Sequence, residues 1–315
     1  MNKGFILGID TSNYTTAVAL LDQAGNLIVQ QRERLEVEKG KKGLRQSKAV
    51  FQHVNKLPEL IAQVIEGYQD QLAKIVVSTR PRDEADSYMP VFRVGQAQAK
   101  TLAHALEIPL IKVSHQAGHL MAGLWSNDLQ LDRFLALHLS GGTSDLLLVN
   151  GGEDAQFDIQ EIGGSQDITA GQFIDRVGVK LGLDFPAGPG LEKLAESATE
   201  DATKLPYSVQ NLEISFSGPC SAAMRKIAAG AAKENIALEV QESIANSLIE
   251  MLSRAIEEYD CSNLLLVGGV MANQYLRDKL KASLENQDLN AKLYFANLQW
   301  SSDNALGTAA LGLEK

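Results

Sequence analysis

The strongest constraint on the fold is a strand-turn-strand pattern that occurs twice in the 315-residue chain. The first copy runs from Phe5 to Asn26 and the second from Phe134 to Gly152. In each copy an apolar strand enters a short turn of small polar residues, and a second apolar strand follows. Such turns leave backbone N–H groups free to face an anion. One turn per half of the chain therefore indicates two lobes that hold a phosphate chain, although either copy alone also fits an ordinary β-hairpin.

A third segment, from Asn263 to Asn273, supports nucleotide binding. It reads as a buried strand that runs into two glycines and then a helix. Glycines at a strand-to-helix junction let the backbone approach a ligand closely. The chain has no GxxxxGK[ST] motif and no GxGxxG after its first strand, which disfavours P-loop and Rossmann folds. The candidate ligand-binding residues of the three turns are Thr11, Ser12, Ser140, Gly141, Gly142, Gly268 and Gly269.

Hydrophobic periodicity predicts alternating strands and helices, typical of an α/β fold with largely parallel sheets. The predicted helices cover residues 47–68, 94–106, 115–124, 169–181, 240–259, 274–285 and 304–313. Further strands are predicted at 74–78, 109–113, 157–162, 264–267 and 292–296, and a Gly/Pro-rich loop at 184–190. We place the lobe boundary near residue 113, which gives lobes of residues 1–113 and 114–315. The last helix is expected to pack back on the first lobe.

Composition limits the cellular setting. No apolar stretch approaches the length of a membrane span, and the two cysteines show no metal-ligand spacing, so we expect a cytoplasmic protein with reduced thiols. A net charge of −10 argues against a surface that binds nucleic acid throughout. Basic residues nevertheless crowd the segment from Arg32 to Lys48. This segment is either a solvated loop or an RNA contact, and the sequence leaves both open.

A candidate metal site lies in the segment SHQAGHL. His115 and His119 are four residues apart, so on a helix both imidazoles share one face and can bind one ion. Gln116 occupies the place of the general-base glutamate of a zinc-protease HExxH motif, which disfavours proteolysis. Asp303, at the start of a predicted helix, is either an N-cap or a third ligand.

Two further polar residues are candidates for contacts with a nucleotide. Asp175 is either an exposed helix acid or an acceptor for ribose hydroxyl groups. Asn273, after the glycine pair, is either a helix cap or an adenosine contact.

Taken together, these motifs resemble one family. GIDTSNYTTAVAL, SHQAGHL, LSGGTSDLLLV, GGSQDITAGQFIDRVGVKLGLDFPAGP, ISFSGP, LLVGGVMANQYLR and SSDNALG occur in this order. The set is similar to the TsaD family of tRNA threonylcarbamoyl transferases, formerly described as O-sialoglycoprotein endopeptidases. The resemblance covers essentially the whole chain. It implies an actin/hexokinase-like ATPase fold, with two duplicated lobes of mixed sheets and flanking helices, and a helical insertion in the C-terminal lobe.

The resemblance also implies residue roles and partners. His115, His119 and Asp303 match the family's metal ligands, which hold iron or zinc. Ser140, Gly141 and Gly142 match its substrate-binding turn, and Asp175, Gly188 and Asn273 match residues that contact ATP or an adenylate. The implied reaction transfers threonylcarbamoyl from its adenylate to adenosine 37 of tRNA, with TsaB- and TsaE-like partners. The sequence leaves a homodimer open.

The chain departs from the family's pattern at positions that flank this chemistry. Tyr14 and Thr15 replace both acids of the first turn, ETS-x-DET in the family. Thr143 replaces the histidine of SGGHT, Gln172 the glutamate of AGEAFD, and Cys220 the lysine of FSG-LK. Because the ligand positions are kept while their surroundings change, we expect a divergent paralogue that still binds metal and nucleotide.

The loop at residues 79–90, TRPRDEADSYMP, replaces the family's glycine-rich TAGPGL. Arg80 and Arg82 in it either bind another anionic substrate or pair with the acids of the loop. Three functions therefore stay open: threonylcarbamoyl transfer to tRNA, carbamoyl transfer to another acceptor, and a non-catalytic nucleotide-binding partner.

Overall fold

The computed structural model describes residues 4–12, 14–37, 44–84, 86–151, 157–199, 204–285, 290–301 and 305–313. The chain divides into two compact units. Unit 1 contains Met1–Leu131, Gly151–Asp158 and Ala296–Lys315, and unit 2 contains Asp132–Asn150 and Ile159–Phe295. Within the described ranges, none of the helices combines the length and apolar character that crossing a bilayer requires.

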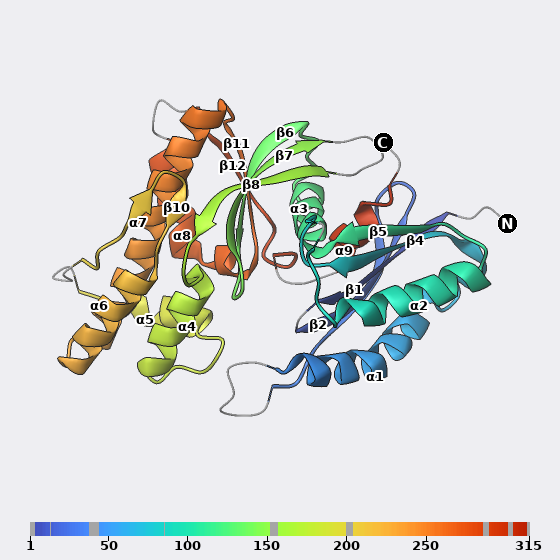
Figure 1. Ribbon diagram of the computed structural model, residues 1–315, viewed down its shortest axis with the longest axis horizontal. Coiled ribbons are helices and arrows are strands. Elements are labelled where there is room, and N and C mark those ends of the chain that lie inside the picture. Colours follow the sequence, from blue (N-terminus) through green and yellow to red (C-terminus); the bar gives the residue numbers. More distant parts are fainter. Residues whose placement is uncertain are drawn as a thin grey trace. The chain divides into compact units, whose positions relative to one another are not determined.

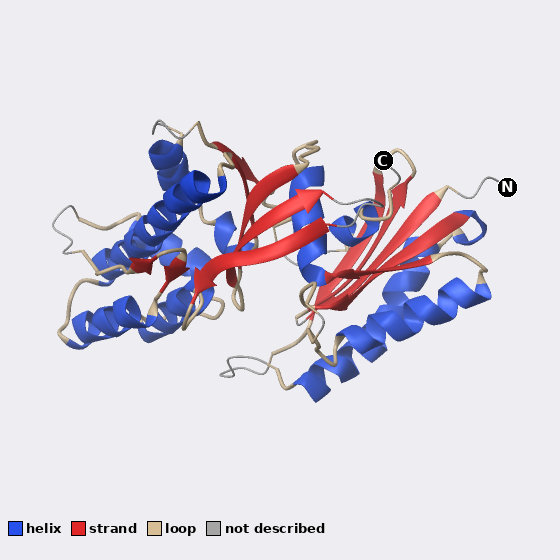
Figure 2. Cartoon of the chain, turned by 45° about the horizontal axis from the view of Figure 1, so that its top comes forward, coloured by secondary structure: helices blue, strands red, loops and turns tan. Residues whose placement is uncertain are grey.

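Unit 1 is built on a five-stranded mixed sheet (Figures 1 and 2). Its strands, in spatial order, are β3 (Leu27–Arg34), β2 (Thr15–Asp22), β1 (Phe5–Ser12), β4 (Leu72–Arg80) and β5 (Leu110–Ser114). The first predicted hairpin is confirmed, because β1 and β2 pair antiparallel from Phe5–Asp22 to Ser12–Thr15. Strands β4 and β5 extend the sheet in parallel with β1.

Alternation along β1 assigns the two faces of this sheet to different helices. Leu7 and Ile9 join the core formed with α1 (Gln46–Ile65) and α2 (Phe92–Ala105). Gly8 faces the opposite way, against Ala305 and α9 (Leu306–Ala310). Because strand side chains alternate between faces, Asp10 lies on the same face as Gly8. That face also carries α3 (His115–Trp125), which packs on α9 and contacts β4 and β5.

Unit 2 is built on a seven-stranded mixed sheet. Its strands, in spatial order, are β12 (Lys292–Phe295), β11 (Asn263–Val267), β6 (Arg133–Leu139), β7 (Ser144–Gly151), β8 (Phe157–Ser165), β10 (Glu213–Ile214) and β9 (Val209–Gln210). β6 and β7 form the second predicted hairpin, antiparallel from Arg133–Asn150 to Leu139–Ser144. β11 runs parallel to β6, so the carboxyl ends of both strands meet at one edge of the sheet.

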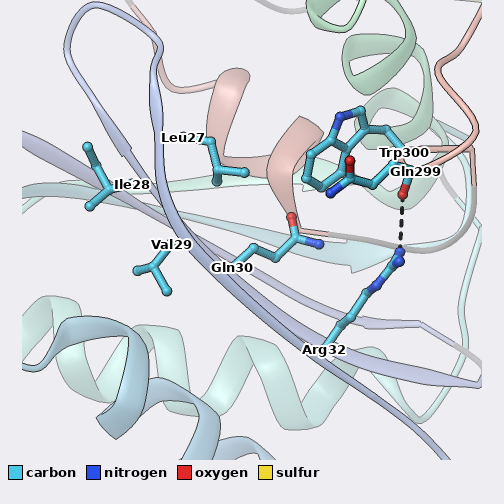
Figure 3. A pocket seen from close by; sticks show the side chains of 7 residues that line it. All are labelled: Leu27, Ile28, Val29, Gln30, Arg32, Gln299 and Trp300. Carbon is cyan, nitrogen blue, oxygen red and sulfur yellow. Dashed lines mark hydrogen bonds between the residues drawn. The ribbon is translucent and has the colours of Figure 1, made fainter.

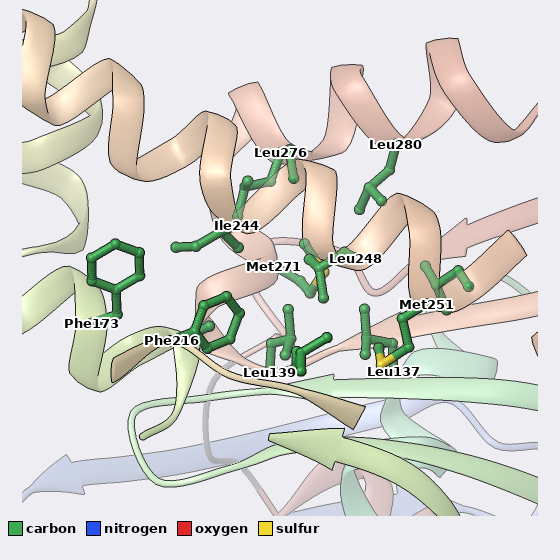
Figure 4. Close-up of a cluster of buried hydrophobic side chains, with 14 of the residues drawn as sticks. Leu137, Leu139, Phe173, Phe216, Ile244, Leu248, Met251, Met271, Leu276 and Leu280 are labelled. Carbon is green, nitrogen blue, oxygen red and sulfur yellow. The ribbon is translucent and has the colours of Figure 1, made fainter. Parts of the chain in front are cut away.

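Helices pack on this sheet and form one continuous apolar core with it. They are α4 (Ala170–Lys180), α5 (Gly188–Ala195), α6 (Ser217–Ala228), α7 (Lys233–Tyr259) and α8 (Gln274–Leu284), with a 3₁₀ turn, η3, at Gly269–Ala272. Figure 4 shows how α7 places Ile244, Leu248 and Met251 over Leu137 and Leu139 of β6. This core holds the ends of β6 and β11, from which the candidate turns project.

Four elements differ from the expectation. The segment Asp184–Gly190 is not a loop throughout, because α5 begins at Gly188. Proline and glycine mark loops in sequence, yet Pro189 occupies the first turn of a helix, where its missing N–H costs no hydrogen bond. The edge strand β3 and the helix α6 carry no clear periodic signal, and α7 starts earlier than predicted.

Candidate functional site

Helix α3 brings the two predicted histidine ligands together. Ser114 caps the helix, since its Oγ accepts from the N–H of Ala117 at 3.0 Å. His115 and His119 therefore lie one turn apart on the same face. Their Nε2 atoms are 3.0 Å apart, and the ring centroids are separated by 4.5 Å. Two imidazole nitrogens at this separation can both bind one ion with Zn–N distances of about 2.0–2.1 Å.

A carboxylate that the sequence analysis missed lies behind His115. Asp10, at the end of β1, is 1% exposed, and its Oδ2 is 2.7 Å from Nδ1 of His115. Its other oxygen accepts the backbone N–H of Ser12 at 2.7 Å. The signal in the sequence is an acid that directly follows the apolar run of residues 5–9, in the GIDTS motif.

The loop at residues 79–90 is tied to the start of α3. The carbonyl of Pro81 accepts the N–H of Gln116 at 3.0 Å. Asp83 accepts the Ser114 hydroxyl at 2.8 Å and forms an ion pair with Arg80. Because Asp83 engages both Arg80 and Ser114, Arg80 is held within its own loop. This loop positions the first turn of α3, where His115 lies.

The third predicted metal ligand, Asp303, lies outside the described residues. Its described neighbours, Ser301 and Ala305, both belong to unit 1, as do His115 and His119. Ser301 donates to the carbonyl of Ala296 at 3.1 Å, and Ala305 packs against β2. Helix α9 follows directly and packs on α3.

The part of the chain that the structure describes contains no group of three His, Cys, Asp or Glu residues arranged to hold a metal ion. The donor chemistry of the pair nevertheless fits one. Imidazole suits both iron and zinc, and a metal-binding histidine commonly donates its other ring N–H to a carboxylate, as the Asp10 contact allows. His115 and His119 would supply two ligands.

Thr11 and Ser12, at the end of β1, are engaged in the fold. Thr11 is fully buried; its hydroxyl donates to the carbonyl of Val91 at 3.0 Å and accepts from the N–H of Gly95 at 3.2 Å. The N–H of Ser12 donates to Asp10, so it is not directed at a ligand. Ligand binding by either residue stays a prediction.

In unit 2, the turn between β6 and β7 is exposed at Gly141 and Gly142. The N–H of Ser140 donates to the carbonyl of Thr143 at 2.9 Å, which closes the turn. A Cβ added to either glycine would have no described atom within 4 Å, apart from those of its chain neighbours. This side of the backbone is therefore open to the approach of a ligand. Thr169 donates to the carbonyl of Gly141 at 3.0 Å, which ties the turn to the N-terminus of α4.

The glycine pair after β11 lies next to the same strand end. Gly268 has φ of 97°, and a Cβ there would collide with the carbonyl of Leu139, the last residue of β6. Only glycine fits this conformation and this close approach. Asn273 caps α8 by accepting from the N–H of Leu276 at 2.9 Å, and its amide donates to Gln241 at 2.8 Å. Its cap role is therefore confirmed, and an adenosine contact stays a prediction.

Asp175 and Gly188 are brought together at the start of α5. Asp175 Oδ1 accepts the N–H of Ala187 at 2.7 Å, and burial raises the pKa of this carboxyl above its usual value. On α5, Glu192 accepts the N–H of Gln274 at 2.6 Å, which joins α5 to the start of α8 beside Asn273. The predicted residues of unit 2 thus come from two places: the strand ends of β6 and β11, and α4 with the N-termini of α5 and α8.

Comparison with known proteins decides the family. The family model for TsaD, tRNA N6-adenosine threonylcarbamoyltransferase, matches residues 28–310. The chain belongs to the TsaD family. A relative from Archaeoglobus fulgidus, a tRNA N6-adenosine threonylcarbamoyltransferase, is 30% identical to this TsaD-family chain over 307 residues, 98% of this chain and 90% of the relative.

A second relative is longer than this TsaD-family chain. The probable bifunctional tRNA threonylcarbamoyladenosine biosynthesis protein of Methanothermobacter thermautotrophicus is 32% identical over 306 residues, which are 97% of this chain. The chain spans only 55% of that relative's length.

Solved structures show the fold. Full-length HypF matches 98% of this TsaD-family chain and 46% of its own length, with a TM-score of 0.63 at 13% identity. A ROK family glucokinase from Streptomyces griseus matches 98% of this chain and 99% of its own, with a TM-score of 0.56 at 12% identity. The predicted actin/hexokinase-like fold with mixed sheets and flanking helices is confirmed. Unit 1 continues past residue 113 to include α3; the two-lobe boundary at 113 stays a prediction.

Among the positions where this TsaD-family chain departs from the family's pattern, two are buried. Thr15 is 6% exposed within the β1–β2 hairpin, and Cys220 is 6% exposed on α6. Burial raises the pKa of the Cys220 thiol, which disfavours the reactive thiolate. Cys220 is therefore a packing residue.

A pocket of about 290 Å³ lies on unit 1 beside the edge strand β3 (Figure 3). It is lined by Leu27, Ile28, Val29, Gln30, Arg32, Gln299 and Trp300. Arg32 donates to the carbonyl of Gln299 at 3.3 Å, and Trp300 packs edge-to-face on Trp125 of α3. These contacts anchor the segment that leads to Asp303.

The basic segment from Arg32 to Lys48, which the sequence leaves open as a solvated loop or an RNA contact, is described only in part. Arg32 and Arg34 lie on β3, while Lys39, Lys41 and Lys42 lie outside the described residues.

Asp167 is a second acid that the sequence analysis did not single out. It accepts from the hydroxyl of Ser215 at 2.5 Å and from the N–H groups of Phe216 and Ser217 at 3.0 and 3.1 Å, at the start of α6. Burial by itself would raise the pKa of Asp167, but these hydrogen bonds and that of Ile168 outweigh it and hold the pKa well below its usual value. The charged carboxylate thus holds the ISFSGP segment.

We predict that Asp167→Asn lowers the free energy of unfolding at pH 7 by about 1 kcal/mol, because the amide carries no charge and keeps only one acceptor oxygen, while the exposed position limits the loss. Because the folded-state pKa is depressed, the contribution is complete above the unfolded pKa of about 4 and is lost as pH falls below it. Urea unfolding should therefore show a difference in the free energy of unfolding between the wild type and Asp167→Asn at neutral pH. This difference should disappear in acid. Asp158→Asn, an exposed acid on β8, is the control, and a constant gap at all pH values would contradict the prediction.

Proposed function

We propose that this protein is a metal-dependent tRNA N6-adenosine threonylcarbamoyltransferase. It would transfer threonylcarbamoyl from its adenylate to adenosine 37 of tRNA, in the cytoplasm and with TsaB- and TsaE-like partners. Family membership supports the reaction class. The observation that carries the proposal for this chain is the pair of Nε2 atoms of His115 and His119, 3.0 Å apart on a capped helix.

In the proposed reaction, N6 of the adenine forms a bond to the carbamoyl carbon. The bond from that carbon to the phosphate oxygen breaks, AMP leaves, and N6 loses a proton. An iron or zinc ion held by His115, His119 and Asp303 would act as a Lewis acid toward phosphate or carbamate oxygens.

The chain's own residues would bind and orient the reactants. The open backbone at Gly141, Gly142 and Gly269 suits the close approach of a nucleotide phosphate, where N–H groups stabilise negative charge. Asp175 and Asn273 are the candidates for contacts with the nucleoside. Asp10 would hold the proton at Nδ1 of His115.

Transfer to a different acceptor gains no support from the loop at residues 79–90. That hypothesis relied on Arg80 and Arg82 as binders of another anion. Arg80 instead pairs with Asp83, which in turn holds the cap of α3. The structure thus favours the second alternative for Arg80, a cation paired within its own loop.

A reconstituted assay tests the function. Metal-loaded protein, threonylcarbamoyl-adenylate, tRNA and the two partner proteins should yield threonylcarbamoyladenosine, detected by mass spectrometry of the digested tRNA. A tRNA with guanosine at position 37 is the matched control and should stay unmodified. Absence of product from the complete mixture, with metal bound at stoichiometry, would reject the proposal.

A further inference from the structure

The contact between Asp10 and His115 joins two distant parts of unit 1. Asp10 lies in the buried part of β1, and His115 begins α3, 105 positions later in the chain. The carboxylate is 1% exposed. Each of its oxygens has a defined partner: Oδ1 accepts the N–H of Ser12, and Oδ2 lies 2.7 Å from Nδ1 of His115.

We propose that Asp10 is a positioning residue that fixes the tautomer and orientation of His115. A carboxylate only accepts hydrogen bonds, so the ring nitrogen that faces it, Nδ1, carries the hydrogen. The lone pair of the neutral ring is then on Nε2, which faces His119. Only a nitrogen with a free lone pair can bind a metal, so Asp10 prepares His115 as a ligand. This role rests on the proposed function, because it presumes that the pair binds an ion.

The surrounding structure fixes both ends of the contact. On the side of Asp10, the adjacent Thr11 is anchored to Val91 and Gly95 of the α2 region. On the side of His115, the first turn of α3 is held by the Ser114 cap and by Pro81. The 2.7 Å contact is therefore set by the packing of β1 and α3 and not by two freely rotating side chains.

An amide at position 10 reverses the tautomer. In Asp10→Asn, the N–H of Ser12 still requires an acceptor, so the amide oxygen turns toward Ser12. The amide nitrogen then faces Nδ1 of His115 and donates to it. This places the hydrogen of the neutral ring on Nε2, where it blocks the metal. The substitution keeps the shape of the side chain, so its effect on metal binding is not one of lost volume.

Two measurements test this role. Zn²⁺ titration against a competing chelator should give a dissociation constant about 10–100-fold higher for Asp10→Asn than for the wild type, the usual effect of losing such a partner. Asp22→Asn, at the other end of the β1–β2 hairpin, is the matched control and should bind Zn²⁺ as the wild type does. In metal-free protein, long-range ¹H–¹⁵N NMR should show the hydrogen of His115 on Nδ1 in the wild type and on Nε2 in Asp10→Asn.

The outcomes separate this inference from the proposed function. Wild-type Zn²⁺ affinity in Asp10→Asn, or a wild-type His115 with its hydrogen on Nε2, overturns the role of Asp10. The second result needs no variant, so it decides the matter even if Asp10→Asn does not fold. A wild type that binds no metal, or a His115→Ala variant that binds it unchanged, contradicts the proposed metal site instead.

Discussion

Replacing His119 by alanine is expected to weaken Zn²⁺ binding by more than about 100-fold, because the loss of a ligand exceeds the 10–100-fold effect of losing a ligand's hydrogen-bond partner. His119 is 6% exposed, and its Nε2 lies 3.0 Å from that of His115. Without it, His115 is the only imidazole of α3 left to bind the ion. If the reaction needs the metal, transfer to tRNA should fall in the same proportion.

The measurement is metal content after dialysis, followed by a Zn²⁺ titration of the metal-free protein. His104→Ala is the matched control, because His104 is an exposed histidine on α2 and lies outside the pair. Its Zn²⁺ affinity should equal that of the wild type. One bound Zn²⁺ per chain in His119→Ala, at wild-type affinity, would show that the ion binds elsewhere.

Gly307→Ala should lower the free energy of unfolding by about 3 kcal/mol or more, at the upper end of overpacking effects. A Cβ at this position of α9 would collide with the carbonyl oxygen of Gly118 and lie 2.7 Å from the backbone nitrogen of Ala122, both on α3. These are backbone atoms, which cannot move aside as the end of a flexible side chain can. The two helices must separate, and α3 carries the histidine pair.

Both tryptophans of the chain report on this packing. Trp125 ends α3 and Trp300 lies against it, with ring centroids 6.0 Å apart, so tryptophan fluorescence follows the unfolding of unit 1. Lys100→Ala, at an exposed position of α2 in unit 1, is the control, and it should change the free energy of unfolding by less than about 0.5 kcal/mol. Equal denaturation midpoints for Gly307→Ala and the wild type would contradict the predicted collision.

Some elements were predictable because their signals are local. The i, i+4 spacing of His115 and His119 places both on one face of any helix. The edge strand β3 was not predictable in this way. Its residues from Gln30 to Arg34 are polar on both faces, because an edge strand is only partly covered by neighbouring elements.

The sequence by itself determined the two hairpins, most of the strand and helix alternation, and the histidine spacing, since each depends on residues that are near one another in the chain. It also carried the family's motifs, which the family match confirms. Only the tertiary structure decided that Asp10 meets His115 and that Gly307 lies on Gly118. Such contacts join segments that chain packing brings together, and no local pattern encodes which buried acid a histidine will face.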